Sequence, residues 1–349
     1  MDKEGILVTG ADGFIGSHFV DYVLKNTDKR ILIVCGWRRG GIGQRLRDIQ
    51  SQDPDGWKSR VSVFSHDLAH PFSMLDAIKV NRFGTDHVVH FAAESHVDRS
   101  IKNPSDVIQN NVMVTVNMLD LSRNIVGLKS FVQISTDEVY GAAPGNYCHK
   151  EWDPIIPSNP YSASKAAQEA VAISYWRTYG VPVILTNTMN NIGERQTADK
   201  FLPMVIRKVL SGEVVDIHSV NDVVGSRFYL HAFNHADAIN FVLNSAVQYE
   251  VPGRQGPFSD RPFRANVVGE LELNNLELAS IVAEEAGKEL KYRLIDAHSS
   301  RPGHDLRYAL DGSFMESKGW TPPVPLILSI KKTVRWYLNN KEWLDAVIE

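Results

Sequence analysis

An alternation of short apolar runs with longer amphipathic stretches constrains the fold of this chain more than any other feature. The apolar runs are rich in β-branched residues and lie at 6–9, 31–34, 61–64, 88–91, 131–134 and 181–185. Between most of them the sequence has helical periodicity, for example at 16–24 and 107–121. Short strands that alternate with helices are typical of a parallel sheet covered on both faces. The pattern therefore predicts an α/β fold with a doubly wound parallel sheet, whose ligands bind beyond the carboxyl ends of the strands.

The composition excludes several classes of protein. A net charge of -4 over 349 residues leaves no basic footprint for nucleic acid, and no apolar run approaches the roughly 18 residues that span a bilayer. Cys35 and Cys148 are too few for a disulfide framework and show no metal-ligand spacing, so a reducing compartment fits. The charged residues 1–4 run directly into the first apolar run, which leaves no room for a signal peptide. We expect a cytoplasmic protein without a nucleic acid, membrane or metal partner.

A glycine-rich segment at 9–17 follows the first predicted strand and opens the first predicted helix. Its glycines allow a tight turn and close approach of a ligand to the backbone, and the free amides of a helix N-terminus bind a pyrophosphate. Such a triplet is a weak signal alone, but its position directly after the first strand makes it strong. We therefore expect a bound dinucleotide at Gly10, Gly13, Phe14, Ile15 and Gly16.

The residues after the second and third predicted strands bear on the choice of dinucleotide. A carboxylate after the second strand would bind a ribose 2′-hydroxyl, but this chain has Arg38 and Arg39 there. Because a guanidinium suits a 2′-phosphate, the segment favours NADP, with NAD as the alternative. The two arginines could instead be solvated loop charges. Asp67 and Leu68 follow the third strand and are placed to meet the adenine, although Asp67 could equally cap a helix.

Two further motifs suggest the chemistry. Tyr161 and Lys165 are one helical turn apart, so that an ammonium can lower the pKa of a phenol on the same face. In the upstream run 135–141, Thr136 can share the same substrate hydroxyl, and Asp137 and Glu138 add two carboxylates. Deprotonation of a hydroxyl suits hydride removal, whereas two carboxylates suit proton abstraction and loss of water. Each motif alone could be an amphipathic helix or a helix cap, but together they predict a sugar dehydratase with an internal redox step.

With these residues assembled, the chain resembles the extended short-chain dehydrogenase/reductases, and specifically the nucleotide-sugar 4,6-dehydratases of the dTDP-glucose type. The resemblance runs almost end to end and includes the segments 92–100, 110–111, 190–191, 301–308 and 332–338. It implies a Rossmann-type sheet with a smaller C-terminal substrate-binding lobe. We expect residues 1–190 to form the dinucleotide-binding and catalytic domain. Residues 191–349, broken by many prolines and glycines, should mainly form the nucleotide-sugar-binding lobe, with some segments returning to the first domain.

The resemblance also implies roles for the catalytic residues. Tyr161, helped by Lys165 and Thr136, would take the proton of the sugar 4-hydroxyl while a hydride passes from C4 to the nicotinamide. Glu138 would then remove the C5 proton and Asp137 would protonate the departing 6-hydroxyl. The hydride finally returns to C6 and leaves a 4-keto-6-deoxy sugar.

For the substrate, the resemblance implicates residues of both halves of the chain. Asn190, Arg227 and Arg301 are expected at the diphosphate, with His304 near the base or ribose, while Glu94, His96 and Arg99 look like cleft-lining residues. Arg227 and Arg301 could instead form surface ion pairs, and His96 could have a structural role. Helices around 105–125 and 159–179 are expected to pair across a two-fold axis in a homodimer.

The sequence departs from the family pattern in three segments. These are the arginine-containing loop after the second strand, the run 190–194, and the run 228–235, which lacks an acidic pair. All three departures concern cofactor or substrate choice. The sequence therefore supports the type of reaction better than the identity of the nucleotide in the substrate. The first candidate substrate is dTDP-glucose, with UDP- and GDP-linked hexoses as alternatives. Two other functions stay open, a nucleotide-sugar 4-epimerase and a non-catalytic dinucleotide sensor.

Overall fold

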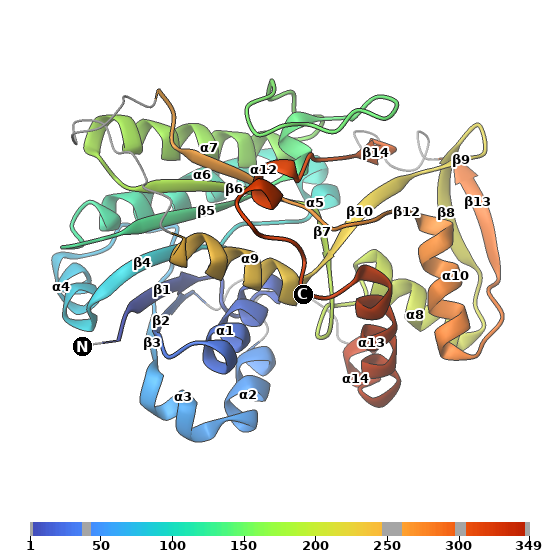
Figure 1. Ribbon diagram of the computed structural model, residues 1–349, viewed down its shortest axis with the longest axis horizontal. Helices are drawn as coiled ribbons and strands as arrows, with labels where there is room; N and C mark the ends of the chain where they lie inside the picture. The colour runs from blue at the N-terminus through green and yellow to red at the C-terminus, as the bar shows by residue number, and fades with distance from the viewer. Residues whose placement is uncertain (1–2, 37–42, 246–259, 297–304, 346–349) are drawn as a thin grey trace.

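The computed structural model describes residues 3–36, 43–245, 260–296 and 305–345. Its central element is a seven-stranded sheet in the order β11-β6-β5-β4-β1-β2-β3, in which all neighbouring strands are parallel (Figure 1). The strands are β1 (Gly5–Thr9), β2 (Arg30–Cys35), β3 (Val61–Ser65), β4 (Thr85–His90), β5 (Ser130–Thr136), β6 (Val183–Thr188) and β11 (Phe263–Val267). The predicted α/β fold with a doubly wound parallel sheet is confirmed.

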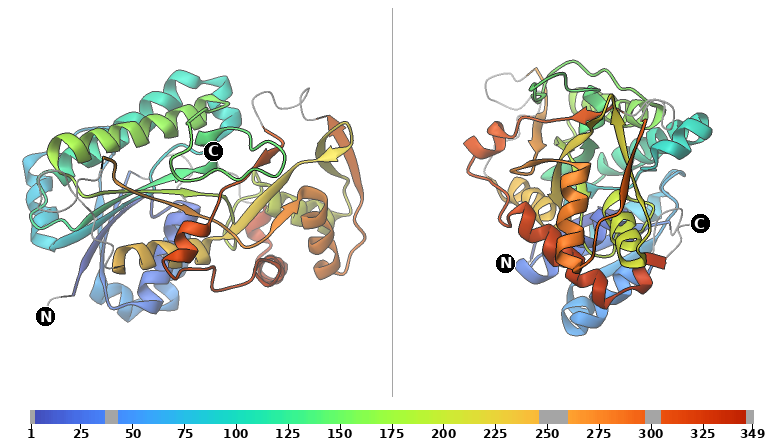
Figure 2. Two further views of the ribbon diagram at one scale, coloured as in Figure 1. Left: turned by 45° about the horizontal axis from the view of Figure 1, so that its top comes forward. Right: turned by 90° about the vertical axis from the view of Figure 1, so that its right-hand side faces the viewer.

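Helices cover both faces of this sheet. The long helices α6 (Pro104–Ser122) and α7 (Pro160–Tyr179) lie together on one face, and α1 (Phe14–Asn26) and α9 (Ala232–Asn244) lie on the other (Figures 1 and 2). Successive residues of a strand point to opposite faces. In β1, Leu7 accordingly joins the core under α6 and α7, whereas Ile6 and Val8 join the core against α1 and α9. Shorter elements complete this part: α2 (Gly43–Gln52), α3 (Pro54–Arg60), α4 (Met74–Phe83), α5 (Val97–Lys102) and the 3₁₀ helix η1 (Asp137–Tyr140).

A second hydrophobic core lies in the C-terminal half. It is built around the helices α8 (Phe201–Ser211), α10 (Asn275–Ala286), α13 (Leu326–Asn339) and α14 (Glu342–Asp345). A three-stranded sheet comprises β8 (Val215–Val220), β9 (Val223–Val224) and β13 (Tyr292–Asp296). A second small sheet comprises β7 (Asn190–Ile192), β10 (Ser226–His231), β12 (Glu272–Asn274) and β14 (Arg307–Tyr308), and α12 (Ser313–Ser317) packs against β11.

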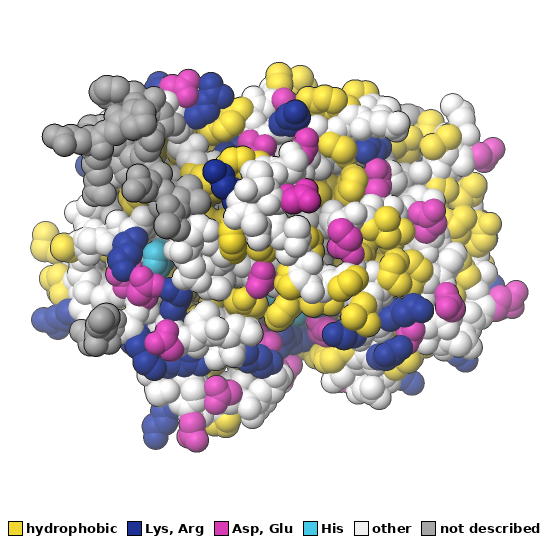
Figure 3. All heavy atoms as spheres, in the orientation of Figure 1, with side chains coloured by type: hydrophobic (Ala, Val, Ile, Leu, Met, Phe, Trp, Pro, Cys, Tyr) yellow, Lys and Arg dark blue, Asp and Glu magenta, His cyan; other side chains and the backbone are white. Residues whose placement is uncertain are grey.

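The surface carries both signs of charge. Acidic and basic side chains are interspersed over the face drawn in Figure 3, with apolar side chains between them. Within the described ranges, the helices lack the combined length and apolar character that crossing a bilayer requires.

The order of the strands determines where a ligand can bind. β1 pairs with both β2 and β4, and from β1 the sheet grows outward on one side through β2 and on the other through β4. At such a switch point the loops leave in opposite directions and open a crevice beyond the carboxyl ends of the strands. Gly10 follows β1 and Phe91 follows β4, so both residues lie at this crevice.

Candidate active site

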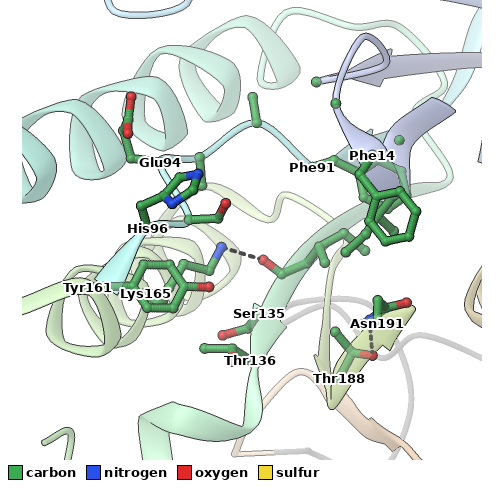
Figure 4. A pocket seen from close by; sticks show the side chains of 18 of the residues that line it. Phe14, Phe91, Glu94, His96, Ser135, Thr136, Tyr161, Lys165, Thr188 and Asn191 are labelled. Atoms are coloured by element: carbon green, nitrogen blue, oxygen red, sulfur yellow. Dashed lines mark hydrogen bonds between the residues drawn. The ribbon is translucent and has the colours of Figure 1, made fainter. Parts of the chain in front are cut away.

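A cavity of about 1010 Å³ occupies this crevice. It extends from the glycine turn after β1 to Tyr161 and Lys165 on α7, and on to Asn190 and Lys200. Figure 4 shows Phe14 and Phe91 on one side of it, with Tyr161 and Lys165 next to each other on the other side. The structure thus brings most of the residues selected from the sequence into one cavity.

The glycine turn meets the requirements of a dinucleotide site. Gly10 has φ +64°, and a Cβ there would lie 2.9 Å from the Ala92 amide nitrogen. A Cβ on Gly16 would lie 2.2 Å from the Gly10 carbonyl oxygen, so α1 can pack this closely only with glycine. The first turn of α1 carries no acidic side chain, which leaves its N-terminus suitable for a phosphate. All five predicted residues of the turn line the cavity: Gly10, Gly13, Phe14, Ile15 and Gly16.

The segments after β2 and β3 border the same cavity. Gly36, Asp67 and Leu68 are among its lining residues. The Asp67 carboxylate accepts a hydrogen bond from the Ala69 amide at 3.1 Å, but the cap of the following helix α4 is Ser73. Asp67 therefore closes a turn and does not cap that helix. Arg38 and Arg39, on which the preference for NADP depended, lie outside the described residues.

Tyr161 and Lys165 are positioned by the first turns of α7. The Asn159 side chain caps this helix by accepting a hydrogen bond from the Ser162 amide at 2.9 Å. Lys165 donates its Nζ hydrogen bond to the Ile134 carbonyl oxygen of β5 at 2.7 Å (Figure 4). Burial lowers the pKa of Lys165 to about 8, although Glu169 on the same helix opposes this effect.

The structure contradicts the expectation that Lys165 lowers the pKa of Tyr161. Burial raises the pKa of Tyr161, and the negative charges of Glu138 and Asp137 raise it further, while a hydrogen bond with Thr136 opposes them. The ammonium of Lys165 is bound to a backbone carbonyl oxygen. Burial of Tyr161 and the two nearby carboxylates therefore determine the pKa of Tyr161. These surroundings keep Tyr161 a neutral phenol at neutral pH.

The two carboxylates stand on one turn of 3₁₀ helix at the end of β5. Thr136 caps this turn by accepting a hydrogen bond from the Glu138 amide at 3.3 Å, and its hydroxyl donates to Asp137 Oδ1 at 2.8 Å. Burial raises the pKa of Asp137 to about 6. Burial, together with repulsion from Asp137, raises the pKa of Glu138 to about 7, and Asn159 donates a hydrogen bond to Glu138 Oε2 at 3.2 Å. Two coupled carboxyl groups that titrate near neutrality can hold one proton between them.

The residues expected at the substrate divide into three groups. Glu94, His96, Arg99 and Asn190 line the cavity, where Arg99 donates to Glu94 at 3.1 Å and His96 lies 3.4 Å from Asp199. Arg227 lies outside this lining, because its guanidinium donates to the Ser226 and Asp305 carbonyl oxygens, each at 2.7 Å, and stacks on Tyr308. Arg301 and His304 lie outside the described residues.

Lys200 is a site residue that the sequence reasoning missed. It lines the cavity with its Nζ 3.5 Å from His96 Nδ1 and 3.6 Å from an Asp199 carboxylate oxygen. Burial lowers its pKa, and its charge lowers the pKa of Glu138. It precedes α8 as a single lysine at no set spacing from a motif, so only the fold reveals its proximity to Glu138.

Comparisons with known proteins agree with this geometry. Residues 7–333 match the family model described as GDP-mannose 4,6 dehydratase. A dTDP-glucose 4,6-dehydratase of Escherichia coli is 33% identical, with 99% of this chain and 96% of that protein covered. The crystal structure of dTDP-glucose 4,6-dehydratase from Streptomyces venezuelae with NAD bound has a TM-score of 0.83 at 33% identity, covering 98% and 99% of the two chains. UDP-glucose 4-epimerase from Thermus thermophilus in complex with NAD has a TM-score of 0.79 at 26% identity, covering 96% and 99%.

The match therefore spans nearly the whole chain, and it coincides with the glycine turn, the Tyr161 and Lys165 pair and the two carboxylates that line one cavity. This chain is an enzyme of the GDP-mannose 4,6 dehydratase family, within the extended short-chain dehydrogenase/reductases.

Proposed function

We propose that this enzyme is a nucleotide-sugar 4,6-dehydratase, a hydro-lyase that converts a nucleoside diphosphate hexose to its 4-keto-6-deoxy derivative. The observation that carries the proposal is the position of Asp137 and Glu138. Both stand on one turn beside Thr136, line the same cavity as Tyr161, and have pKa values raised to about 6 and 7. Hydride transfer alone has no need of two carboxyl groups that exchange protons near neutrality.

The cofactor would be held along the glycine turn, with Asp67 and Leu68 toward its adenine end. When bound, the nicotinamide supplies a hydride acceptor for the oxidation of the sugar and a hydride donor for the last reduction. The residues of this chain supply the proton transfers. Tyr161 can accept the 4-hydroxyl proton only as the phenolate. Since burial disfavours that form, the phenolate would depend on the positive charge of Lys165 one turn away.

Elimination of water follows from the first oxidation. A ketone at C4 acidifies the hydrogen at C5, which Glu138 removes as the ionised member of the carboxyl pair. Asp137 protonates the departing 6-hydroxyl as the protonated member, and Glu138 returns its proton to C5 when the hydride adds to C6. The two groups are coupled, and the lower pKa of Asp137, about 6 against about 7 for Glu138, places a single shared proton on Glu138 in the free enzyme, so that proton must pass to Asp137 before elimination.

We propose dTDP-glucose as the substrate, since relatives with that specificity cover the whole chain. Glu94 and His96 would line the cleft, Asn190 would contact the diphosphate, and Lys200 supplies a positive charge. Arg227 and Arg301 would bind the diphosphate and His304 the base or ribose, within a substrate lobe formed mainly by residues 191–349. For Arg227 this requires a move away from the carbonyl oxygens that it binds.

A panel of dTDP-, UDP-, GDP- and CDP-hexoses tests reaction and substrate together. Product masses are recorded by mass spectrometry, and Tyr161→Phe serves as the inactive control. Loss of one water from the dTDP-hexose is the expected result. A product of unchanged mass with an inverted C4 would instead establish a 4-epimerase, the activity of the Thermus thermophilus relative. No turnover of any hexose, with tight cofactor binding, would point to a dinucleotide sensor.

We propose NADP as the cofactor, because two arginines and no carboxylate follow β2. NAD is the alternative and is the cofactor bound in the Streptomyces venezuelae relative. Titrating both dinucleotides against wild type and Arg39→Ala decides between them. The variant should lose affinity for NADP and keep its affinity for NAD. An unchanged ratio would show that Arg39 is a solvated loop charge and that the preference for NADP has no support from it.

We also propose a homodimer in the cytoplasm. The supporting observations are the exposed apolar side chains Ile101 on α5 and Ile108 on α6, each 37% exposed, and two free cysteines. Light scattering after size exclusion should give a dimer for wild type and a monomer for Ile108→Glu.

A further inference from the structure

A buried ion pair between Glu169 and Arg264 lies next to the site without lining the cavity. Glu169 is on α7, one turn after Lys165, and Arg264 is on β11, 95 residues further along the chain. Their side chains are 0% and 1% exposed. Arg264 donates one hydrogen bond to Glu169 Oε2 and another to the Glu151 carbonyl oxygen at 2.8 Å. An arginine fork of this kind can compensate a carboxylate that has been removed from water.

The other oxygen of Glu169 binds the end of the catalytic strand. Oε1 accepts hydrogen bonds from the Ser135 hydroxyl at 2.5 Å and from the Asn187 amide at 2.8 Å. The same amide group donates to the Thr136 carbonyl oxygen at 3.0 Å. Since Lys165 donates to the Ile134 carbonyl oxygen, three consecutive residues of β5 are bound by this group of side chains. The next two residues along the chain are the carboxylates of the 3₁₀ turn.

The charge of Glu169 also acts on Lys165. Burial lowers the pKa of Lys165, and Glu169 is the charged group that raises it. Among the described residues, His90 on β4 is a further titratable group near Lys165, but burial lowers the pKa of His90 to about 3. His90 is therefore neutral over the working range of pH, and Glu169 is left as the neighbour that favours the ammonium form of Lys165.

We propose that the Glu169–Arg264 pair is a positioning unit that holds the end of β5, and with it Thr136, against the helix that carries Tyr161 and Lys165. The inference rests on the proposed function for the reaction that is being positioned. The residues act through Ser135, Asn187 and Lys165 and do not touch the substrate.

The test is the double variant Glu169→Gln with Arg264→Met, which removes both charges together. Glutamine keeps an oxygen that can accept from Ser135, and no charge is left alone in the interior. Lys165 loses the carboxylate that raises its pKa, so its ammonium form is lost at lower pH. We expect an unchanged KM and a lower rate of cofactor reduction, the half-reaction that does not need the carboxyl pair, and the alkaline limb of that rate should move to lower pH by about one unit.

Two comparisons separate positioning from general stability. Glu4→Gln with Lys29→Met removes another ion pair, near the amino ends of β1 and β2, and should leave the alkaline limb in place. Arg264→Lys keeps both charges, so the alkaline limb should stay in place, while the rate of cofactor reduction should be lowered because lysine lacks the fork. A folded double variant with an unmoved limb, or one with a raised KM and a normal kcat, would overturn the proposal. Should the double variant fail to fold, Arg264→Lys, which keeps both charges, must still lower the rate of cofactor reduction at an unchanged KM, and a normal rate would overturn the proposal.

A second readout is independent of turnover. The pKa of Lys165, followed by lysine side-chain NMR and assigned with Lys165→Met, should fall in the double variant. If wild type transforms none of the hexoses, the proposed function fails, and this titration still decides whether Glu169 acts on Lys165.

Discussion

Replacement of Glu138 by glutamine separates the two halves of the proposed reaction. Glutamine has nearly the same shape and can still bind Asn159, but it cannot accept the C5 proton. The first hydride transfer depends on Tyr161, Thr136 and Lys165, so the bound cofactor should still be reduced. Elimination of water should be slowed by about 10² to 10⁴, the usual contribution of a general base, or about 3 to 5 kcal/mol in activation free energy.

The effect of Glu138→Gln on rate and on stability should depend on pH. Because burial and Asp137 raise the pKa of Glu138 to about 7, the wild-type base loses its charge as the pH falls through that value. The wild-type rate should therefore decrease below about pH 7, and the variant should lack this limb. A raised folded-state pKa also means that ionised Glu138 disfavours folding, so Glu138→Gln should melt at a higher temperature than wild type above pH 7.

The assay is a stopped-flow experiment followed by mass spectrometry. Absorbance of the reduced nicotinamide reports the first half-reaction, and the mass of the released sugar nucleotide reports loss of water. Glu284→Gln, which removes a carboxylate that is 73% exposed on α10, is the matched control and should behave as wild type. Normal dehydration by Glu138→Gln would refute the assignment of Glu138 as the base.

Three further substitutions test the glycine turn, the charge pairing of Glu4 and the core under α6 and α7. Gly16→Ala places a Cβ 2.2 Å from the Gly10 carbonyl oxygen, so dinucleotide affinity measured by fluorescence titration should fall at least about tenfold; unaltered affinity would contradict the packing of this turn. Lys129 and a second lysine lower the pKa of Glu4 from 4.5 to about 2, so this stabilisation is present above pH 4.5 and is lost as the pH falls toward 2. In acid denaturation, Glu4→Gln should destabilise the protein at neutral pH and have no effect near pH 2, and a constant difference would refute this linkage. Trp176 is 2% exposed in the core under α6 and α7, so Trp176→Ala should lower the free energy of unfolding in urea by about 3 to 5 kcal/mol, and a loss below about 1 kcal/mol would contradict its burial.

Much of the architecture could be predicted because its signals are local. The apolar runs at 6–9 and 31–34 alternate with helical stretches, and both became neighbouring strands of the central sheet. Tyr161 and Lys165 share a face because a helix repeats every 3.6 residues, and Thr136 to Glu138 are consecutive in the chain. Such spacings survive folding unchanged, so the candidate catalytic residues could be chosen without coordinates.

The sequence by itself determined which segments form strands and helices, where the glycine turn lies, and which reactive side chains are available. Each of these features depends on residues close together in the chain. Only the tertiary structure decided how these groups behave. It placed Lys200 near Glu138, joined Glu169 to Arg264 across 95 residues, and bound Arg227 to backbone carbonyl oxygens. It also reversed the expected effect on Tyr161, because burial and two carboxylates raise a phenol pKa that one lysine at helical spacing was expected to lower. Desolvation and long-range charge depend on the whole fold, and no local spacing contains them.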